Sequence, residues 1–215
     1  MPDFEWEDKC RGIVCGIDEA GRGPWAGPVV AGAVIIKDRN LHPDLLSGLD
    51  DSKKLSAKKR EKLYNLLFEE EKNGKVEIGI GEASCAEIDE YNILNATFMA
   101  MERARAGLKT PPEQALVDGN QKPRRFNCAA QTVVKGDAKS YSISAASIVA
   151  KVYRDRLMAE LAQKYPYYGF EKNAGYGTAA HIAGLKQYGV TPQHRKSYKP
   201  IQAFMTEKGS ADIDD

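Results

Sequence analysis

The sequence predicts an α/β or mixed α+β fold built around one sheet. Segments rich in Val and Ile come first, and strand-like and longer helix-like segments then alternate along the chain. The composition of the 215 residues, 42% hydrophobic and 28% charged, is typical of an ordinary globular protein. Because there is no internal repeat and no linker long enough to separate two domains, we expect a single domain over residues 1–200.

The first part of the chain predicts two strands joined by a glycine–proline turn. Residues 11–18 and 29–37 are runs rich in Val and Ile, and GRGPWAGP lies between them. GRGPWA formally matches a dinucleotide-binding fingerprint, but that fingerprint requires a helix next, whereas VVAGAVII predicts a strand. The turn is therefore expected to offer its backbone N–H and C=O groups to some other ligand.

Helices and strands then alternate. Ser56 predicts the N-cap of a helix that runs to about Lys72, where Asn73–Gly74 ends it. The later elements are expected to be a strand at 75–83, a helix in two pieces at 85–107, strands at 115–120 and 131–137, a helix at 142–165 that begins at a serine cap, and a helix from Thr178 to about Tyr188. The part from about residue 142 is thus expected to be helical, and residues 201–215 are expected to form a polar, acidic, partly disordered tail.

Four acidic residues follow apolar runs near glycines. Three strand-like segments end in them: the first segment ends in Asp18 and Glu19, LVDGN contains Asp118, and VVKGD contains Asp137. Strand ends can converge at one edge of a sheet, and carboxylates without nearby His or Cys suit Mg²⁺ or Mn²⁺ rather than zinc. Two such ions are the usual arrangement for phosphodiester hydrolysis. The alternative for each acid is a turn residue, since Asp-Gly is a common turn pair.

The net charge of +1 neither recruits nor excludes a polyanion, so any nucleic-acid site must come from local clustering of basic residues. Scattered surface charge is the alternative interpretation of such residues. The candidates for a basic track are Lys122, Arg124, Arg125, Lys135, Lys139, His194, Arg195 and Lys196.

Cysteine usage and hydropathy indicate the cellular compartment. The four cysteines show no CxxC pair and no zinc-ligand spacing, which favours reduced thiols in a reducing environment. The N-terminus lacks an apolar signal core, and no apolar run approaches the ~20 residues that cross a bilayer. We therefore expect a cytoplasmic protein that has no contact with a membrane.

These motifs together resemble those of ribonuclease HII, the type 2 ribonuclease H of bacteria. They occur in the order of that family and extend from about residue 11 to 200. The matching segments are GIDEAGRGPWAGPVVAGAVI at 16–35, DSKKLS at 51–56, VDGN at 117–120, VVKGD at 133–137, SISAASIVAKVYRD at 142–155, GYGT at 175–178 and HRKSY at 194–198.

The resemblance implies a ribonuclease H-like fold, with a central mixed five-stranded sheet flanked by helices and a helical C-terminal part, in one catalytic domain. It also implies endonucleolytic cleavage of RNA in RNA–DNA hybrids, and cleavage 5′ to single ribonucleotides embedded in duplex DNA, as in ribonucleotide or primer removal. Two Mg²⁺ or Mn²⁺ ions would act with substrate bound, leaving 3′-hydroxyl and 5′-phosphate ends. We expect a monomer. The carboxylates carried over by position are Asp18, Glu19, Asp118 and Asp137.

The resemblance also implies residues that read the substrate. Gly21, Arg22 and Gly23 correspond to the loop that reads the ribose 2′-hydroxyl, a group that both donates and accepts hydrogen bonds. Tyr176 matches the tyrosine that packs on the neighbouring deoxyribose. GYGT departs from the GYPT of many members, and we expect a looser loop there because Gly177 takes the place of a proline.

Two lysines in DSKKLS, Lys53 and Lys54, would neutralise phosphates if the resemblance holds. The alternative is a solvated pair of loop residues.

Two other functions are compatible with the motifs. Ribonuclease HIII shares the acidic layout, but its members carry an N-terminal substrate-binding domain, whereas 17 residues precede Asp18, and its loop typically lacks the arginine at position 22. A non-catalytic nucleic-acid-binding module is the second alternative, and the presence of all four acids argues against it.

Overall fold

The computed structural model of the chain describes residues 2–50, 52, 54–123 and 126–209. They form two compact units. The first, here called the sheet unit, comprises Met1–Ala20, Val30–Glu82 and Thr97–Val152. The second, the helical unit, comprises Gly21–Val29, Ala83–Ala96 and Tyr153–Asp215.

The sheet unit holds a five-stranded sheet in the order β3-β2-β1-β4-β5. β1 pairs antiparallel with β2 and parallel with β4, and β4 pairs parallel with β5, so the sheet is mixed. The strands are β1 (Val14–Ala20), β2 (Val29–Ile36), β3 (Val76–Ala83), β4 (Gln114–Asp118) and β5 (Ala129–Val133). The prediction of a central mixed sheet of five strands is therefore confirmed, and β2 follows the turn as expected.

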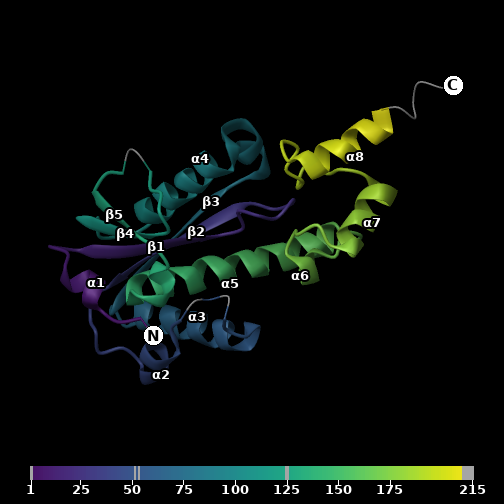
Figure 1. Ribbon diagram of the computed structural model, residues 1–215. Helices are drawn as coiled ribbons and strands as arrows, with labels where there is room; N and C mark the ends of the chain where they lie inside the picture. Colours follow the sequence, from purple (N-terminus) through teal and green to yellow (C-terminus); the bar gives the residue numbers. More distant parts are fainter. Residues whose placement is uncertain (1, 51, 53, 124–125, 210–215) are drawn as a thin grey trace. The chain divides into compact units, whose positions relative to one another are not determined.

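Helices cover both faces of this sheet (Figure 1). The N-terminal part of α5 (Tyr141–Lys164) packs against β1 so closely that a Cβ on Gly16 would lie 2.1 Å from the carbonyl carbon of Ser142. Only glycine permits that approach. Ile143 of α5 also packs with Leu116 and Val133 in a buried cluster. The remaining helices of the sheet unit are α1 (Glu5–Asp8), α2 (Pro43–Gly48), α3 (Ala57–Lys72) and the C-terminal part of α4 (Cys85–Ala106).

The helical unit contains the rest of α4 and α5 together with α6 (Phe170–Asn173), α7 (Ala179–Tyr188) and α8 (Lys199–Gly209). In Figure 1, α5 to α8 are drawn from green to yellow. The core of the helical unit is an apolar cluster of side chains brought together from distant parts of the chain. The buried members are Ala26, Met158, Tyr168, Phe170, Leu185 and Ile201.

Several local predictions are confirmed. The Ser56 side chain accepts a hydrogen bond from the amide of Lys59 and so caps α3. Thr178 caps α7 in the same way. α4 is interrupted at Asn92, whose φ of 66° is left-handed, so the expected helix is indeed in two pieces.

Other boundaries differ from the sequence-based expectation. β5 ends at Val133 because Lys135 takes a left-handed conformation, and Asp137 lies in a 3₁₀ turn, η1 (Gly136–Ala138), rather than at a strand end. The cap of α5 is Ser140, whose Oγ accepts from the amide of Ile143 at 3.2 Å. α8 occupies the first part of the segment expected to be a polar tail, because Ile201 is buried in the helical core. Residues 210–215 lie outside the described residues.

None of the described helices is both long enough and apolar enough to cross a membrane. The four cysteines, Cys10, Cys15, Cys85 and Cys128, are free.

Candidate active site

The register of the sheet brings two of the predicted acids side by side. Ile17 on β1 pairs with Val117 on β4, so the next residue of each strand, Asp18 and Asp118, lies at the same level of the sheet. Alternate residues of a strand face the same side, so Asp18 shares the face of Gly16, on which α5 packs. The two carboxylates therefore start from neighbouring strands on one face at the carboxyl end of β1 and β4.

Asp137 joins this pair through the 3₁₀ turn after β5. The amide of Gly136 donates a hydrogen bond to Oδ1 of Asp118 at 2.7 Å, which ties the turn to the end of β4. Asp137 is buried, with 9% of its surface exposed. Glu19 follows Asp18 along β1, so its side chain leaves the strand on the opposite face.

Burial and like charges act together on Asp18. It is 7% exposed, and burial raises its pKa well above the usual value, an effect increased by the charges of Glu19, Asp118 and, to a smaller extent, Asp137. A hydrogen bond from the amide of Glu19 to Oδ1, at 2.7 Å, partly offsets this rise in pKa. The charges of the other three predicted acids thus all act on Asp18 and disfavour its ionised form.

The donor set fits a hard divalent cation. Carboxylate oxygens are the ligands that Mg²⁺ and Mn²⁺ prefer, and a cation would offset the repulsion that raises the pKa of Asp18. Among the described residues, no three Asp, Glu, His or Cys side chains lie close enough together to hold a metal ion.

The glycine turn that follows Glu19 belongs to the helical unit. Gly21 has a φ of 96°, and a Cβ at this position would lie 2.0 Å from Nε of Arg154. Both its backbone conformation and its close neighbour therefore require glycine. Arg22 and Gly23 are exposed, as a binding loop requires.

Tyr176 lies next to this turn within the helical unit. It is 53% exposed, and a Cβ on Gly23 would lie 3.4 Å from Cε1 of its ring. Gly177 is packed against the indole of Trp25, because a Cβ there would lie 2.2 Å from Cη2. The space beside Gly177, the glycine that departs from the common GYPT pattern, is thus filled by the ring of Trp25.

Two buried arginines donate to backbone carbonyls in this region: Arg195 to those of Gly21, Arg22 and Gly27, and Arg154 to others. Arg154 and Arg195 are 2% and 0% exposed. Arg154 donates to the carbonyl oxygens of Pro28, Ala174 and Ala26 at 2.9, 3.0 and 3.2 Å. The sequence interpretation missed both roles, although a turn rich in exposed carbonyls calls for donors, and these arginines lie in the KVYRD and HRKSY motifs.

The predicted basic track is only partly compatible with the structure. His194 and Arg195 are fully buried, so neither offers its charge to an external phosphate, and that interpretation of these two residues is wrong. Their polar atoms are used inside the protein because burial requires hydrogen-bond partners. Lys54 is exposed and lies 3.5 Å from a carboxylate oxygen of Asp50. Lys53, Arg124 and Arg125 lie outside the described residues.

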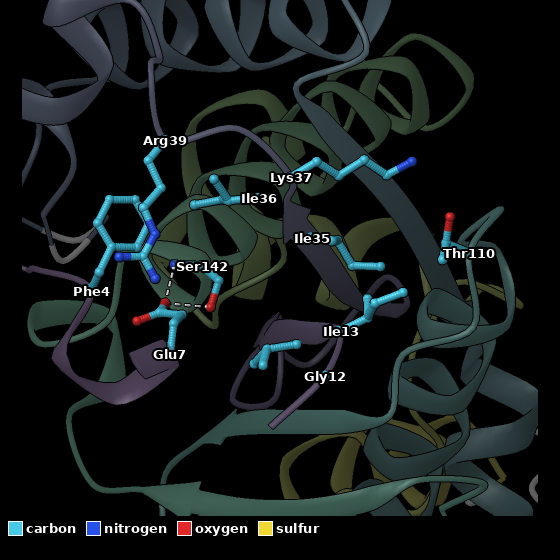
Figure 2. A pocket seen from close by; sticks show the side chains of 11 residues that line it. Phe4, Glu7, Gly12, Ile13, Ile35, Ile36, Lys37, Arg39, Thr110 and Ser142 are labelled. Carbon is cyan, nitrogen blue, oxygen red and sulfur yellow. Dashed lines mark hydrogen bonds between the residues drawn. The ribbon is translucent and has the colours of Figure 1, made fainter. Parts of the chain in front are cut away.

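A separate pocket of about 430 Å³ lies at the other end of β1 (Figure 2). Gly12, Ile13 and Val14 line it, and the Glu7 carboxylate in it accepts hydrogen bonds from the amide and hydroxyl of Ser142 at 2.9 and 2.7 Å. Because β1 runs from this pocket toward Asp18, the pocket is distinct from the carboxylate cluster.

Solved structures with the same fold are nucleases. The crystal structure of ribonuclease H2 from Pyrococcus horikoshii matches with a TM-score of 0.73 and 30% identity, over 91% of this chain and 98% of that one. The crystal structure of Bst-RNase HIII in complex with Mn²⁺ matches with a TM-score of 0.69 over 91% of this chain and 70% of that one, but at 16% identity. The fold places the chain in the ribonuclease H-like class of nucleases.

Sequence comparison gives the family. The family model for ribonuclease HII matches residues 15–201. The ribonuclease HII of Rhodospirillum rubrum is 56% identical over 202 residues, which cover 94% of this chain and 91% of that protein. The chain belongs to the ribonuclease HII family. It is a ribonuclease H enzyme, an endoribonuclease of RNA–DNA hybrids, so the two alternatives, a ribonuclease HIII-like enzyme and a non-catalytic module, are not supported.

Proposed function

We propose that this enzyme also cleaves 5′ to single ribonucleotides embedded in duplex DNA, and that Asp18, Glu19, Asp118 and Asp137 bind two Mg²⁺ or Mn²⁺ ions when substrate is bound. The observation that carries the metal assignment is the burial of Asp18, whose pKa is raised first by burial and then by the charges of the other three acids. A buried carboxylate that other carboxylates repel is a group that a bound cation would stabilise.

Cations held by these carboxylates supply activation of water and charge stabilisation at the scissile phosphate. The positions of the acids on β1, β4 and η1 would fix where the cations are held, and the cations would in turn orient the substrate phosphate. Asp118 is itself oriented by the amide of Gly136. The products would carry 3′-hydroxyl and 5′-phosphate ends. The Mn²⁺ complex of Bst-RNase HIII is in keeping with this choice of metal.

We assign substrate selection to the helical unit. Gly21, Arg22 and Gly23 would read the ribose 2′-hydroxyl through their backbone, and Tyr176 would pack on the neighbouring deoxyribose. The exposure of Arg22, Gly23 and the Tyr176 ring supports these roles. Lys53 and Lys54 would contact phosphate, and the exposed side chain of Lys54 is available for that contact.

The corresponding cellular role is removal of ribonucleotides during DNA repair and of primers during replication, by a monomer in the cytoplasm. We propose that the sheet unit and the helical unit act as one catalytic domain, because β1 leads directly from the acids into the turn.

A nicking assay tests the proposal. Wild-type enzyme is incubated with a duplex that carries one ribonucleotide, with a uniform RNA–DNA hybrid and with an all-DNA duplex, each with and without Mg²⁺. We expect a single nick 5′ to the ribonucleotide, hybrid cleavage, no cut in all-DNA, and loss of both activities in EDTA. Hybrid cleavage without the single nick would contradict the junction activity alone, and full activity in EDTA would contradict the metal assignment.

A further inference from the structure

Arg195 is a buried cation whose N–H groups are all used by the protein. Nε and Nη2 donate to the carbonyl oxygen of Gly27 at 3.0 and 2.9 Å. Nη1 donates to the carbonyl of Arg22 at 2.8 Å and to the hydroxyl of Tyr198 at 3.0 Å, and Nη2 also donates to the carbonyl of Gly21. A guanidinium has five N–H groups, so none remains for substrate.

This arrangement fixes the direction of the amides on the turn. In a trans peptide the C=O and the following N–H point in opposite directions within one plane. The carbonyls of Gly21 and Arg22 point at Arg195, so the amides of Arg22 and Gly23 point away from it. The hydroxyl of Tyr198 also donates to the carbonyl of Arg22, at 2.8 Å, and reinforces the same orientation.

His194, the preceding residue, makes a second connection. The amide of Thr191 donates to its Nδ1 at 3.0 Å, so this nitrogen accepts and the proton of the neutral ring is on Nε2. His194 Nε2 then donates to His181 Nε2 at 3.0 Å. His181 is left with its proton on Nδ1, which donates to the carbonyl of Tyr176 at 2.9 Å.

Both histidines are fully buried, so water does not compete for these bonds. Burial lowers the pKa of His181 and lowers that of His194 to about 4, which keeps both rings neutral at pH 7. The neutral pair has one consistent order of donors and acceptors from Thr191 to Tyr176. The adjacent residues His194 and Arg195 are thus connected to the two parts of the proposed ribose-reading surface, which are Tyr176 and the glycine turn.

We propose that His194 and Arg195 are the positioning pair of that surface: Arg195 orients the amides of Arg22 and Gly23 toward the 2′-hydroxyl, and His194, acting through His181, positions Tyr176. The inference rests on the proposed reading function of the turn and of Tyr176. Neither His194 nor Arg195 touches substrate. The ligand that they select for indirectly is a ribonucleotide whose neighbour is a deoxyribonucleotide.

The experiment compares affinities rather than turnover. All variants carry Asp118→Asn to suppress cleavage, and fluorescence anisotropy gives Kd for a duplex with one ribonucleotide and for the identical all-DNA duplex. Arg195→Lys keeps the charge but cannot serve three carbonyls and a hydroxyl. For this variant, we expect the ratio of the affinity for the ribonucleotide duplex to the affinity for the all-DNA duplex to fall about 5- to 10-fold toward one, the size expected for one misdirected hydrogen bond. Its affinity for the all-DNA duplex should be unchanged.

Arg154→Lys is the matched control because Arg154 is as deeply buried but serves the carbonyls of Ala26, Pro28 and Ala174 instead. It should lose comparable thermal stability and keep most of its preference for ribose. An equal fall in both lysine variants would mean general loosening of the helical unit and would overturn the proposal. If Arg195→Lys does not fold, Tyr198→Phe decides, since it removes one donor to the carbonyl of Arg22, and an unchanged affinity ratio in it would also overturn the proposal.

The role of His194 is tested by a double-mutant cycle. His194→Gln should lower the affinity ratio when Tyr176 is present and have no further effect in a Tyr176→Ala background, whereas the effect of Arg195→Lys should persist there. Additive effects of His194→Gln and Tyr176→Ala would contradict the connection through His181. If the parental Asp118→Asn enzyme bound both duplexes with equal affinity, the reading function and this inference would be overturned together. If that enzyme preferred the ribonucleotide duplex and the Arg195→Lys variant kept the same preference, the inference alone would be overturned.

Discussion

The carboxylate cluster and the glycine turn follow each other directly in the chain, but different interactions hold them in place. Asp18 and Asp118 are placed by the backbone pairing of β1 and β4, which any strand-forming neighbours maintain. The turn from Gly21 to Gly27 is held by the guanidinium group of Arg195, which donates hydrogen bonds to carbonyl groups 168 to 174 residues earlier in the chain. The position of the cluster therefore depends on the regular backbone pairing of the strands, whereas the position of the turn depends on a few specific side chains.

This contrast separates two kinds of sensitivity. Changing an acid should alter the chemistry with little effect on folding, because removal of a repelling charge does not disturb the strand pairing. Changing Arg195, which donates to the carbonyls of Gly21 and Arg22, should alter substrate choice and stability together, because this buried donor serves several carbonyls at once.

The largest expected effect is that of Asp118→Asn. Loss of one carboxylate should lower kcat by about 10²–10³-fold, in the range for removal of one group that stabilises developing charge. Thermal stability should stay the same or rise, since a charge that raises the pKa of Asp18 is removed. Steady-state cleavage of a uniform hybrid at saturating Mg²⁺, with thermal unfolding, measures both. The exposed Asp38→Asn is the control, and retention of full cleavage by Asp118→Asn would exclude Asp118 from the site.

A second effect concerns stability in acid and tests the helical unit. Burial, followed by the charge of His181, lowers the pKa of His194 from 6.5 to about 4. Between these values the unfolded chain binds a proton that the folded chain does not, so the free energy of unfolding decreases as the pH falls through this window. The total contribution is about 3 kcal/mol, fully present above pH 6.5.

Urea unfolding at several pH values between 7 and 4.5, compared with His194→Gln, isolates this contribution. The comparison is needed because the raised pKa of Asp18 acts with the opposite sign. We expect the stability of the variant to depend less steeply on pH in this window. Parallel curves for the two proteins would show that His194 does not carry the effect.

A smaller effect is expected for Gly21→Ala. The alanine would need a φ of 96° and a Cβ 2.0 Å from Nε of Arg154, so the turn must shift. Strain of this kind costs about 1–3 kcal/mol, and we expect preference for a single ribonucleotide over all-DNA to fall about 10-fold or more. Gly74→Ala is the control, because its φ is 75° and nothing lies within 4 Å of the added Cβ. It should lose about 1 kcal/mol of stability and no selectivity.

The smallest expected effect is that of Lys54→Ala. One exposed phosphate contact should contribute a few-fold to KM and about one unit to the slope of log affinity against log salt concentration. The exposed Lys72→Ala, at the C-terminal end of α3, is the matched control. Equal salt slopes for wild type and Lys54→Ala would favour the alternative of a solvated loop lysine.

The elements that could be predicted are those whose signals are local. Ser56, Thr178 and the Asn73–Gly74 pair mark helix ends through short-range hydrogen bonds, and Val- and Ile-rich runs mark strands. Asp137 is predicted at a strand end but lies in a 3₁₀ turn, because the left-handed conformation of Lys135 ends the strand before it. Lysine is not a residue type that favours this conformation, so the sequence does not signal the turn. α8 was missed because burial of Ile201 depends on partners distant in sequence.

By itself, the sequence determined the acidic residues, the order of the strands along the chain and the need for glycine in the turn, because residue type, spacing and periodicity carry these properties directly. The tertiary structure decided which acids lie side by side, since that follows from the register of β1 and β4. It also decided that Arg195 and His194 act inside the protein rather than on a phosphate. Burial is a property of the packed chain, and the same residues would serve as surface cations if they were exposed to water.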